Sequence, residues 1–377
     1  MKKLSLILVT LLILTMIAAG ASFSVSAAEV TTSGSCGNFG NNVVFVYDEA
    51  TETLTLSGEG ETEMIPFMVP WNKKGYPKLS KLVIEEGVTS IGDDLFGTCK
   101  DLVNVSLPST LTSIGARAFQ DCTSLTEINL PEALTVIGVD AFSRCTSLES
   151  LNIPSGVSVL PAGIFDGCSN LKNVTLGNGI TSVGNDAFKD CTKLTSINLP
   201  NGVTEIGDKA FSGCEALASV TLPTSLKTIG NEAYAYCAKI ESVSIPSGVT
   251  AIGEGAFYAC TSLSEIKIPV SVTSIGYNAF STYADAVSIS YAGTEAAWNA
   301  MENTDEYKDG YTISFGGADN SDADDSQTAP TEPIAQPDSE KKSFGCGSSI
   351  TLGAGFSLLV LLASMVMVIG KRKIVES

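Results

Sequence analysis

The sequence contains no histidine, and this absence removes several kinds of active site. A Ser-His-Asp triad and a Cys-His pair both need an imidazole to carry a proton, so neither can be assembled. A zinc site would have to use thiolates or carboxylates alone. No glycine-rich phosphate-binding loop follows an expected strand. A pair of surface carboxylates remains available to catalysis, which makes a surface hydrolase the third and least favoured functional class.

Basic residues are also scarce. The chain has 22 lysines and arginines against 41 aspartates and glutamates, and its net charge is −19. A surface of this sign repels the phosphates of nucleic acids and anionic lipids, so no nucleic-acid partner is expected. Solubility of an exposed domain explains the acidity, and a specific cationic partner is the less favoured interpretation.

A repeat of 23 residues dominates the sequence, and its clearest copy is 125–147. A large aromatic residue stands three places before each repeated cysteine, from Phe96 to Phe257. The cysteines themselves lie at positions 99, 122, 145, 168, 191, 214, 237 and 260. A chain of this length could form two or three ordinary domains, but an array of repeats grows as one continuous core. We therefore expect one long domain.

Each unit begins with a strand-like stretch that has apolar residues at places one, four and six. By alternation, places four and six point into the core, and places three and five point outward. Proline ends most of these strands because it has no N–H to give to a ladder. A turn, then another short strand or extended stretch, a glycine and an Ala-Phe-x-x-Cys segment follow. We expect this last segment to form one helical turn. Pro161 replaces the glycine in the fourth copy, so that coil should bend differently.

Glycine recurs at two places in the unit. Gly156, Gly202 and Gly248 follow the strand, where we expect a turn that uses positive φ. The second glycine, exemplified by Gly138, is expected to allow a tight bend before the helical turn.

Neither face of one unit can be buried alone, so the units must stack. The expected fold is a β-rich repeat solenoid of the leucine-rich repeat type, with about nine to ten coils of parallel short strands spaced about 4.8 Å apart. The pattern L-x-x-I-x-[LI]-P…[VL]-T-x-I-G-x-x-A-F-x-x-C over about 79–291 resembles the BspA-like repeat of bacterial surface proteins. Ser33–Gly37 and Tyr291–Trp298 resemble the flanks of such arrays. The resemblance implies a secreted or membrane-attached protein, several relatives being associated with adhesion.

The two ends of the chain predict export and anchoring. Lys2 and Lys3 precede an apolar run and small residues up to Ala28, which is typical of a cleaved secretory signal. Residues 350–370 carry no charge and are long enough to span a bilayer, and basic residues follow at once. These features predict a single-pass protein of the cell membrane, with extracellular repeats and a cytoplasmic C-terminus.

The resulting domain organisation has seven parts. Trp71 and Tyr76 are expected to pack against the first repeat, and the β-rich runs at 43–47 and 53–57 to form a hairpin or two coils of a cap. The parts are a signal peptide (1–28), an N-terminal β cap (29–78), the solenoid (79–291), a C-terminal cap with a short helix and a last strand (292–316), a disordered acidic linker (317–343), a transmembrane helix (350–370) and a cytoplasmic tail (371–377).

Stacking would bring the repeated cysteines close together, but each would then have two equivalent neighbours and Cβ atoms too far apart for the usual disulfide. Buried free thiols are favoured over disulfides. Single thiolates 23 residues apart also lack the clustering of zinc sites, so no metal and no cofactor is expected. Cys346, just before the expected span, is interpreted as an ordinary thiol, with processing or acylation as the alternative.

We expect the binding residues at the outward strand places, which carry serine, threonine and asparagine in most copies. Asn129, Asn152 and Asn198 are the candidate ligand-binding residues, and the expected partner is a protein or glycan at the cell surface. Tyr236 and Tyr258 could add a small exposed contact patch on the other arm, whereas Tyr234 replaces a core phenylalanine. No catalytic residue is assigned. The alternative function is a structural cell-envelope scaffold without a specialised ligand.

Overall fold

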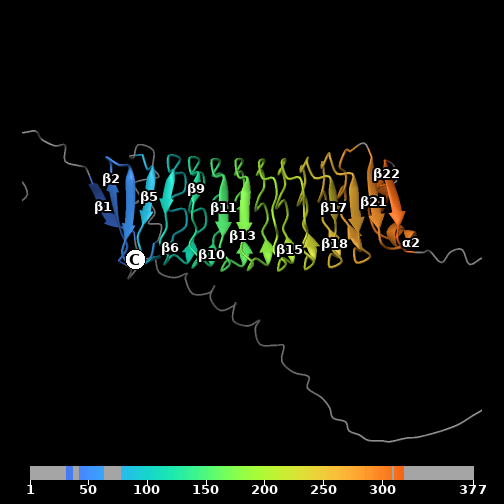
Figure 1. Ribbon diagram of the computed structural model, residues 1–377, viewed down its shortest axis with the longest axis horizontal. Coiled ribbons are helices and arrows are strands. Elements are labelled where there is room, and N and C mark those ends of the chain that lie inside the picture. The colour runs from blue at the N-terminus through green and yellow to red at the C-terminus, as the bar shows by residue number, and fades with distance from the viewer. Residues whose placement is uncertain (1–30, 37–41, 63–77, 285, 308–309, 318–377) are drawn as a thin grey trace, which may run out of the picture. The chain divides into compact units, whose positions relative to one another are not determined.

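The computed structural model describes residues 31–36, 42–62, 78–284, 286–307 and 310–317. All of them lie in the first of two compact units, which ends at Asp322. In this unit the chain winds into a solenoid whose coils contribute stacked parallel strands (Figure 1). The predicted β-rich solenoid is confirmed.

The longer strands form one side of the solenoid. Where they pair within the repeats, residue n lies opposite residue n + 23, so equivalent places of successive units stand side by side. The two coils between β13 and β17 contribute only an isolated bridge, Asn198 to Thr221. The strands are β5 (Lys81–Ile84), β7 (Asn104–Ser106), β9 (Glu127–Ile128), β11 (Ser150–Ile153), β13 (Asn173–Leu176), β17 (Ser242–Ser244), β19 (Glu265–Ile268), β21 (Val287–Tyr291) and β22 (Tyr311–Phe315).

Shorter strands form a second row, which is interrupted once between β10 and β12. On both sides of the break a glycine donates its N–H to the previous coil, Gly138 to Ile114 and Gly184 to Leu160. Pro161 occupies the equivalent place and has no N–H, so the ladder stops there. The row comprises β4 (Gly60–Glu61), β6 (Val88–Ile91), β8 (Ser113–Ile114), β10 (Val136–Ile137), β12 (Val159–Leu160), β14 (Ser182–Val183), β15 (Glu205–Ile206), β16 (Thr228–Ile229), β18 (Ala251–Ile252) and β20 (Ser274–Ile275).

The stretch from the second glycine to the cysteine place, which we call the arm and which includes the Ala-Phe-x-x-Cys segment, forms linked turns instead of the expected helical turn. Residues with left-handed backbone interrupt it, such as Arg117 (φ 55) and Asp121 (φ 59). They direct alternate N–H groups toward the next coil. Arg117, Phe119 and Asp121 thus each donate a 2.8 Å hydrogen bond to a carbonyl of the following coil. Backbone groups that a helix would pair internally are paired between coils.

The repeated glycines are explained by close approach between coils. A Cβ on Gly138 would lie 2.5 Å from the carbonyl carbon of Gly115 and 2.6 Å from Cα of Ala116. Gly248, after the strand, would place a Cβ 2.6 Å from the carbonyl oxygen of Leu226. The expectation of positive φ at Gly156, Gly202 and Gly248 was wrong, and only Gly87, at the same place of the first coil, has a positive φ (103°).

The core contains a continuous column of aromatic rings from Phe96 to Phe280. Neighbouring ring centroids are 5.0–6.1 Å apart, and all nine rings are fully buried. Tyr234 fills the phenylalanine place as predicted, but its buried hydroxyl has no hydrogen-bond partner. The column thus carries one buried polar atom that a phenylalanine would not introduce.

The described N-terminal part is antiparallel where the repeats are parallel. β2 (Val44–Asp48) pairs with both β1 (Thr31–Ser35) and β3 (Thr53–Ser57) as antiparallel neighbours, and β3 then pairs in parallel with β5. In this N-terminal part the side chains of Val43, Phe45 and Tyr47 point inward and are buried.

The C-terminal elements complete the last arm. α2 (Glu295–Asn299) begins after Thr294, whose hydroxyl accepts the N–H of Ala297, and it buries Trp298 at 2 % exposure. In η2 (Thr304–Tyr307), Glu306 accepts the N–H of Asn278 through Oε2, and the Tyr307 hydroxyl accepts that of Phe280. These side chains replace the carbonyls that a further coil would supply.

The prediction of a single-pass membrane protein is overturned. Among the residues that the structure describes, no helix is long and apolar enough to cross a bilayer. α2 has five residues, about a quarter of the length that a hydrocarbon core of about 30 Å requires. The stretches to which a role was assigned at 1–28, 350–370 and 371–377 lie outside the described residues, as do most of 317–343 and the residues Trp71, Tyr76 and Cys346.

Substitution of Gly138 by alanine should destabilise the solenoid, because the new Cβ would overlap the backbone of the preceding coil. We expect a loss of about 1–3 kcal/mol, measured by thermal or urea unfolding. The substitution Ser196→Ala, at an exposed place on the outer side of its coil, should change stability by less than about 0.5 kcal/mol. Equal effects of the two substitutions would contradict the close-approach explanation.

The Tyr234→Phe substitution should raise the thermal midpoint, since it removes a buried hydroxyl without a partner whose burial costs about 1–3 kcal/mol. Tyr307→Phe is the matched control, because it removes the hydroxyl that accepts the Phe280 N–H and should lower the midpoint. A destabilised Tyr234→Phe protein would show that the hydroxyl is needed.

Candidate binding surface

The outward side of the longer strands, which we call the strand face, carries the residues predicted to bind. Places three and five are exposed in every repeat from Asn104 to Lys267. Asn129, Asn152 and Asn198 are all exposed and occupy the same place on three coils. Asn152 lies opposite Thr175 and Asn198 opposite Thr221, so this place forms a row of amides and hydroxyls along the solenoid.

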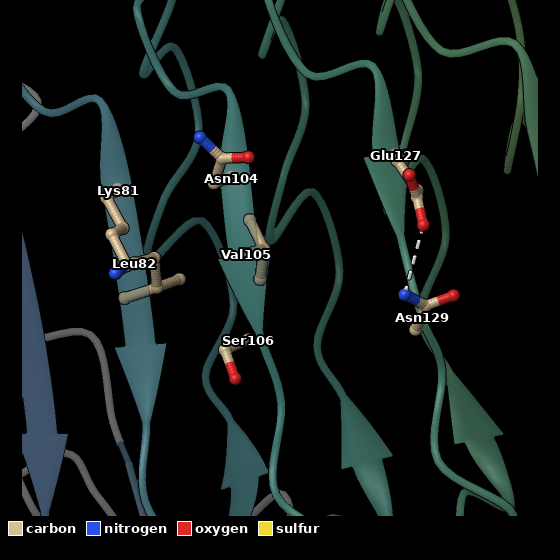
Figure 2. Close-up of a pocket in the computed structure, with 7 residues that line it drawn as sticks. All are labelled: Lys81, Leu82, Asn104, Val105, Ser106, Glu127 and Asn129. Atoms are coloured by element: carbon tan, nitrogen blue, oxygen red, sulfur yellow. Dashed lines mark hydrogen bonds between the residues drawn. The ribbon is translucent and has the colours of Figure 1, made fainter.

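A shallow hollow of about 200 Å³ lies at the N-terminal end of the strand face (Figure 2). Lys81, Asn104 and Glu127 stand opposite one another on β5, β7 and β9. The Asn129 amide donates a 3.2 Å hydrogen bond to Oε1 of Glu127. The full lining is Lys81, Leu82, Asn104, Val105, Ser106, Glu127 and Asn129.

Of the three predicted asparagines, only Asn129 lines this hollow, while Asn152 and Asn198 lie on later coils. Sequence reasoning placed Asn104 and Glu127 on the outward face but did not include Lys81. Lys81 occupies place three of the first unit, so extending the same alternation by one coil would have found it.

The hollow offers both donors and acceptors to a polar ligand. Lys81 supplies an ammonium, Glu127 a carboxylate, and the asparagines and Ser106 supply neutral groups of both kinds. Glycoside hydrolysis uses two carboxyl groups across the scissile bond, whereas this lining contributes one. The arrangement therefore fits recognition of a polar surface better than acid–base catalysis.

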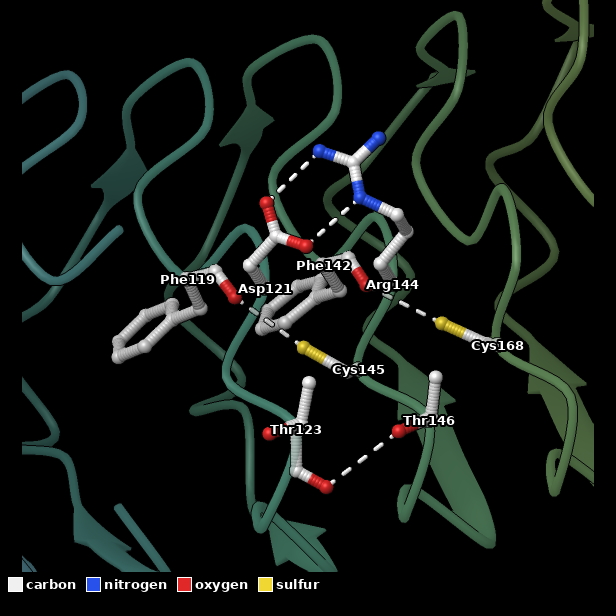
Figure 3. A network of polar contacts seen from close by, with 8 residues as sticks. All are labelled: Phe119, Asp121, Thr123, Phe142, Arg144, Cys145, Thr146 and Cys168. Atoms are coloured by element: carbon white, nitrogen blue, oxygen red, sulfur yellow. Dashed lines mark hydrogen bonds and ion pairs between the residues drawn. The ribbon is translucent and has the colours of Figure 1, made fainter. Parts of the chain in front are cut away.

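The repeated cysteines are free and buried, as predicted. Each thiol from Cys122 to Cys260 donates to the carbonyl of the aromatic residue 26 positions earlier, with S···O distances of 3.1–3.2 Å. Figure 3 shows two of these contacts, Cys145 to Phe119 and Cys168 to Phe142. The thiols are therefore hydrogen-bonded members of the core, a role that sequence reasoning missed.

Burial suppresses the reactivity of these thiols. It raises the pKa of Cys99, Cys168 and Cys260 to about 12 from the ordinary value of 9.0, because a thiolate would be poorly solvated in the core. No group of three metal-ligating side chains occurs among the described residues. The column is structural and supplies neither a nucleophile nor a metal ligand.

The outer surface of the arm carries ion pairs between successive coils. Arg144 forms two 2.7 Å hydrogen bonds to the carboxylate of Asp121 (Figure 3), and Arg117 does the same with Asp94. Both arginines are partly exposed, so each pair contributes at most about 1 kcal/mol. These pairs add modestly to the backbone hydrogen bonds that link neighbouring coils.

Comparison with known protein families identifies the repeat. A family described as "BspA type Leucine rich repeat region" matches residues 74–195 and 181–295, in six copies. The chain belongs to this family. BspA-type leucine-rich repeat proteins are generally binding scaffolds, and the residues that the structure describes show no arrangement that indicates catalysis.

Solved leucine-rich repeat structures are similar to this BspA-type chain. A leucine-rich repeat protein from Bacteroides ovatus is 23% identical, with a TM-score of 0.55 over 78% of this chain and 79% of that one. One from Eubacterium ventriosum is 23% identical, with a TM-score of 0.43 over 70% and 73%. The T. pallidum leucine-rich repeat protein is 28% identical, with a TM-score of 0.36 over 46% and 86%. No curated protein matches the chain.

The thiol column should make the protein sensitive to alkali. The unfolded chain loses thiol protons above about pH 9, whereas the folded chain retains those of Cys168 and Cys260 to about pH 12. The free energy of unfolding should therefore fall over this interval, by up to about 1.4 kcal/mol per pH unit for each thiol. Urea midpoints at pH 8 and pH 10 test this.

Cys168→Ala is the informative variant, because it should show a shallower pH dependence than the wild type regardless of its starting stability. Titration of lysines and tyrosines is common to both proteins and cancels in the comparison. Identical slopes would exclude Cys168 as a source of the alkaline loss.

Proposed function

We propose that this chain is a surface protein that acts by binding, and that its strand face holds a partner protein or glycan. Family membership supports a protein-interaction role. The observation that carries the proposal is the exposed row of amides and hydroxyls along the stacked coils, held at a fixed spacing by ladders on most coils and by the bridge at Asn198. A backbone fixed in this way loses little conformational entropy when a ligand binds.

The shape of the face favours an extended ligand. The hollow of about 200 Å³ is smaller than the pockets of about 300–1,000 Å³ that enclose small molecules. Asn129, Asn152 and Asn198 lie on coils spread along the row, so a ligand that reaches all three must be long. We propose that each asparagine contributes a modest contact, and that Lys81 and Glu127 orient one end of the ligand.

The parts that flank the solenoid retain their proposed roles. We propose residues 1–28 as an export signal, 29–78 and 292–316 as caps of the array, and 317–343 as a linker. Adhesion to host proteins or cells is one use of such a surface.

The test is a screen of the purified full chain against matrix proteins and a glycan array, followed by titration of any saturable ligand. Each polar contact is worth about 1 kcal/mol, so the triple variant Asn129→Ala, Asn152→Ala and Asn198→Ala should bind at least about tenfold more weakly. The readout is the dissociation constant from calorimetry.

The matched control is Thr135→Ala, Thr181→Ala and Thr204→Ala, which removes three exposed hydroxyls near the shorter strands. It should leave binding unchanged. Equal affinity of both variants would exclude the strand face. Concentration-dependent self-association without any ligand would instead support the alternative, a structural envelope scaffold.

A further inference from the structure

Four tyrosines gather on the arm side of the last coils, away from the strand face. Tyr236, Tyr277 and Tyr283 are 51%, 56% and 69% exposed, and Tyr258 is half-buried between two of them. The rings of Tyr236 and Tyr258 meet edge to face with centroids 5.5 Å apart, as do those of Tyr258 and Tyr283. We call these residues the tyrosine patch. The patch predicted from Tyr236 and Tyr258 is thus larger than expected.

The fold does not require these rings. Tyr236 has a φ of 62°, a left-handed conformation that is unfavourable for a bulky side chain. The fold needs no aromatic ring there, because the equivalent places of other coils are also left-handed and hold residues of other types, such as Thr98, Asp121, Arg144, Asp190, Gly213 and Ala259. Tyr283 also has a left-handed backbone, with a φ of 58°. Large exposed rings in a strained backbone indicate a role outside the core.

The patch is pre-organised. The hydroxyls of Tyr258 and Tyr283 are 2.7 Å apart and share a hydrogen bond. This bond, then partial burial, then the charges of Tyr258, Tyr236 and Tyr277 raise the pKa of Tyr283. The phenols of Tyr236, Tyr258 and Tyr277 therefore all lie within electrostatic reach of Tyr283. Tyrosine rings fixed in this way offer a large contact area with little entropy to lose.

Negative charge borders the patch. Glu254 is exposed and occupies the same place as Tyr277, one coil earlier. The Glu306 carboxylate contacts the backbone of Asn278, which directly follows Tyr277. Aromatic faces also attract cations, and the net charge of −19 would draw a basic ligand over a longer range.

We propose that the tyrosine patch is a second binding surface, which takes an arginine- and lysine-bearing segment of a partner protein. Cationic side chains would lie over the ring faces of Tyr236, Tyr277 and Tyr283. Their N–H groups would donate to phenol oxygens and to the Glu254 carboxylate. The site is independent of the strand face, because the tyrosine patch lies on the arm side of the coils.

The test titrates the full chain by calorimetry with a short peptide of alternating arginine and glycine. Each exposed ring contributes about a two- to fivefold increase in affinity. The double variant Tyr236→Asn and Tyr283→Asn should therefore bind about four- to 25-fold more weakly. Asparagine suits left-handed backbone, so this variant should fold, and an unchanged thermal midpoint verifies that.

Tyr236→Phe with Tyr283→Phe is the control that keeps the rings, and it should bind within about twofold of the wild type. Raising the ionic strength from about 0.01 M to about 0.15 M should weaken peptide binding, as the screening length falls from about 30 Å to about 8 Å. The triple asparagine variant of the strand face should bind the peptide normally, which separates the two proposals.

Three results would overturn the proposal: no peptide binding by the wild type, equal binding by the double asparagine variant, or equal binding of a matched glutamate-glycine peptide. A neutral oligosaccharide that bound in place of the peptide, with the same dependence on Tyr236 and Tyr283, would show the patch to be a glycan site instead.

Discussion

Pairing of backbone groups between coils is the constraint on which this structure depends. The unit is too short and too irregular to satisfy its N–H and carbonyl groups internally, so each coil relies on its neighbours. The arm shows this most clearly, because left-handed residues such as Arg117 and Asp121 turn three N–H groups of every coil toward the next. Side chains at each place of the unit are then selected by what the adjacent coil presents.

The cysteine and glycine columns follow from this dependence. The Phe119 carbonyl accepts the N–H of Cys122 and also the thiol S–H of Cys145. The thiol therefore provides the second hydrogen bond of a buried carbonyl oxygen. Glycine recurs where the backbone of the previous coil leaves no room for a Cβ. Both proposed binding surfaces use places that face away from neighbouring coils, namely the outward strand positions and the outer surface of the arm.

Much of this could be predicted from the sequence, because a strict period reports which residues are equivalent and alternation reports which point inward. These two rules were enough to predict that Asn129, Asn152 and Asn198 are exposed and that Tyr234 is buried. The arm conformation could not be predicted, since Ala-Phe-x-x-Cys also suits a helical turn and only contacts with the next coil decide otherwise. The hollow beside Glu127 and the position of Tyr283 against Tyr258 likewise depend on distances between coils.

The arm ladder has a direction, because its N–H groups point toward the C-terminal end and its carbonyls point back. The peptide dipoles therefore align along the array, as they do in a helix, and place partial positive charge at the last coil. The Glu306 carboxylate meets that charge at Asn278. The same C-terminal elements also pair with β21 and donate a hydrogen bond to the Ile275 carbonyl of the last coil. These contacts involve the end of the array, so whole 23-residue units could be added or removed in its middle while the same ending continues to fit.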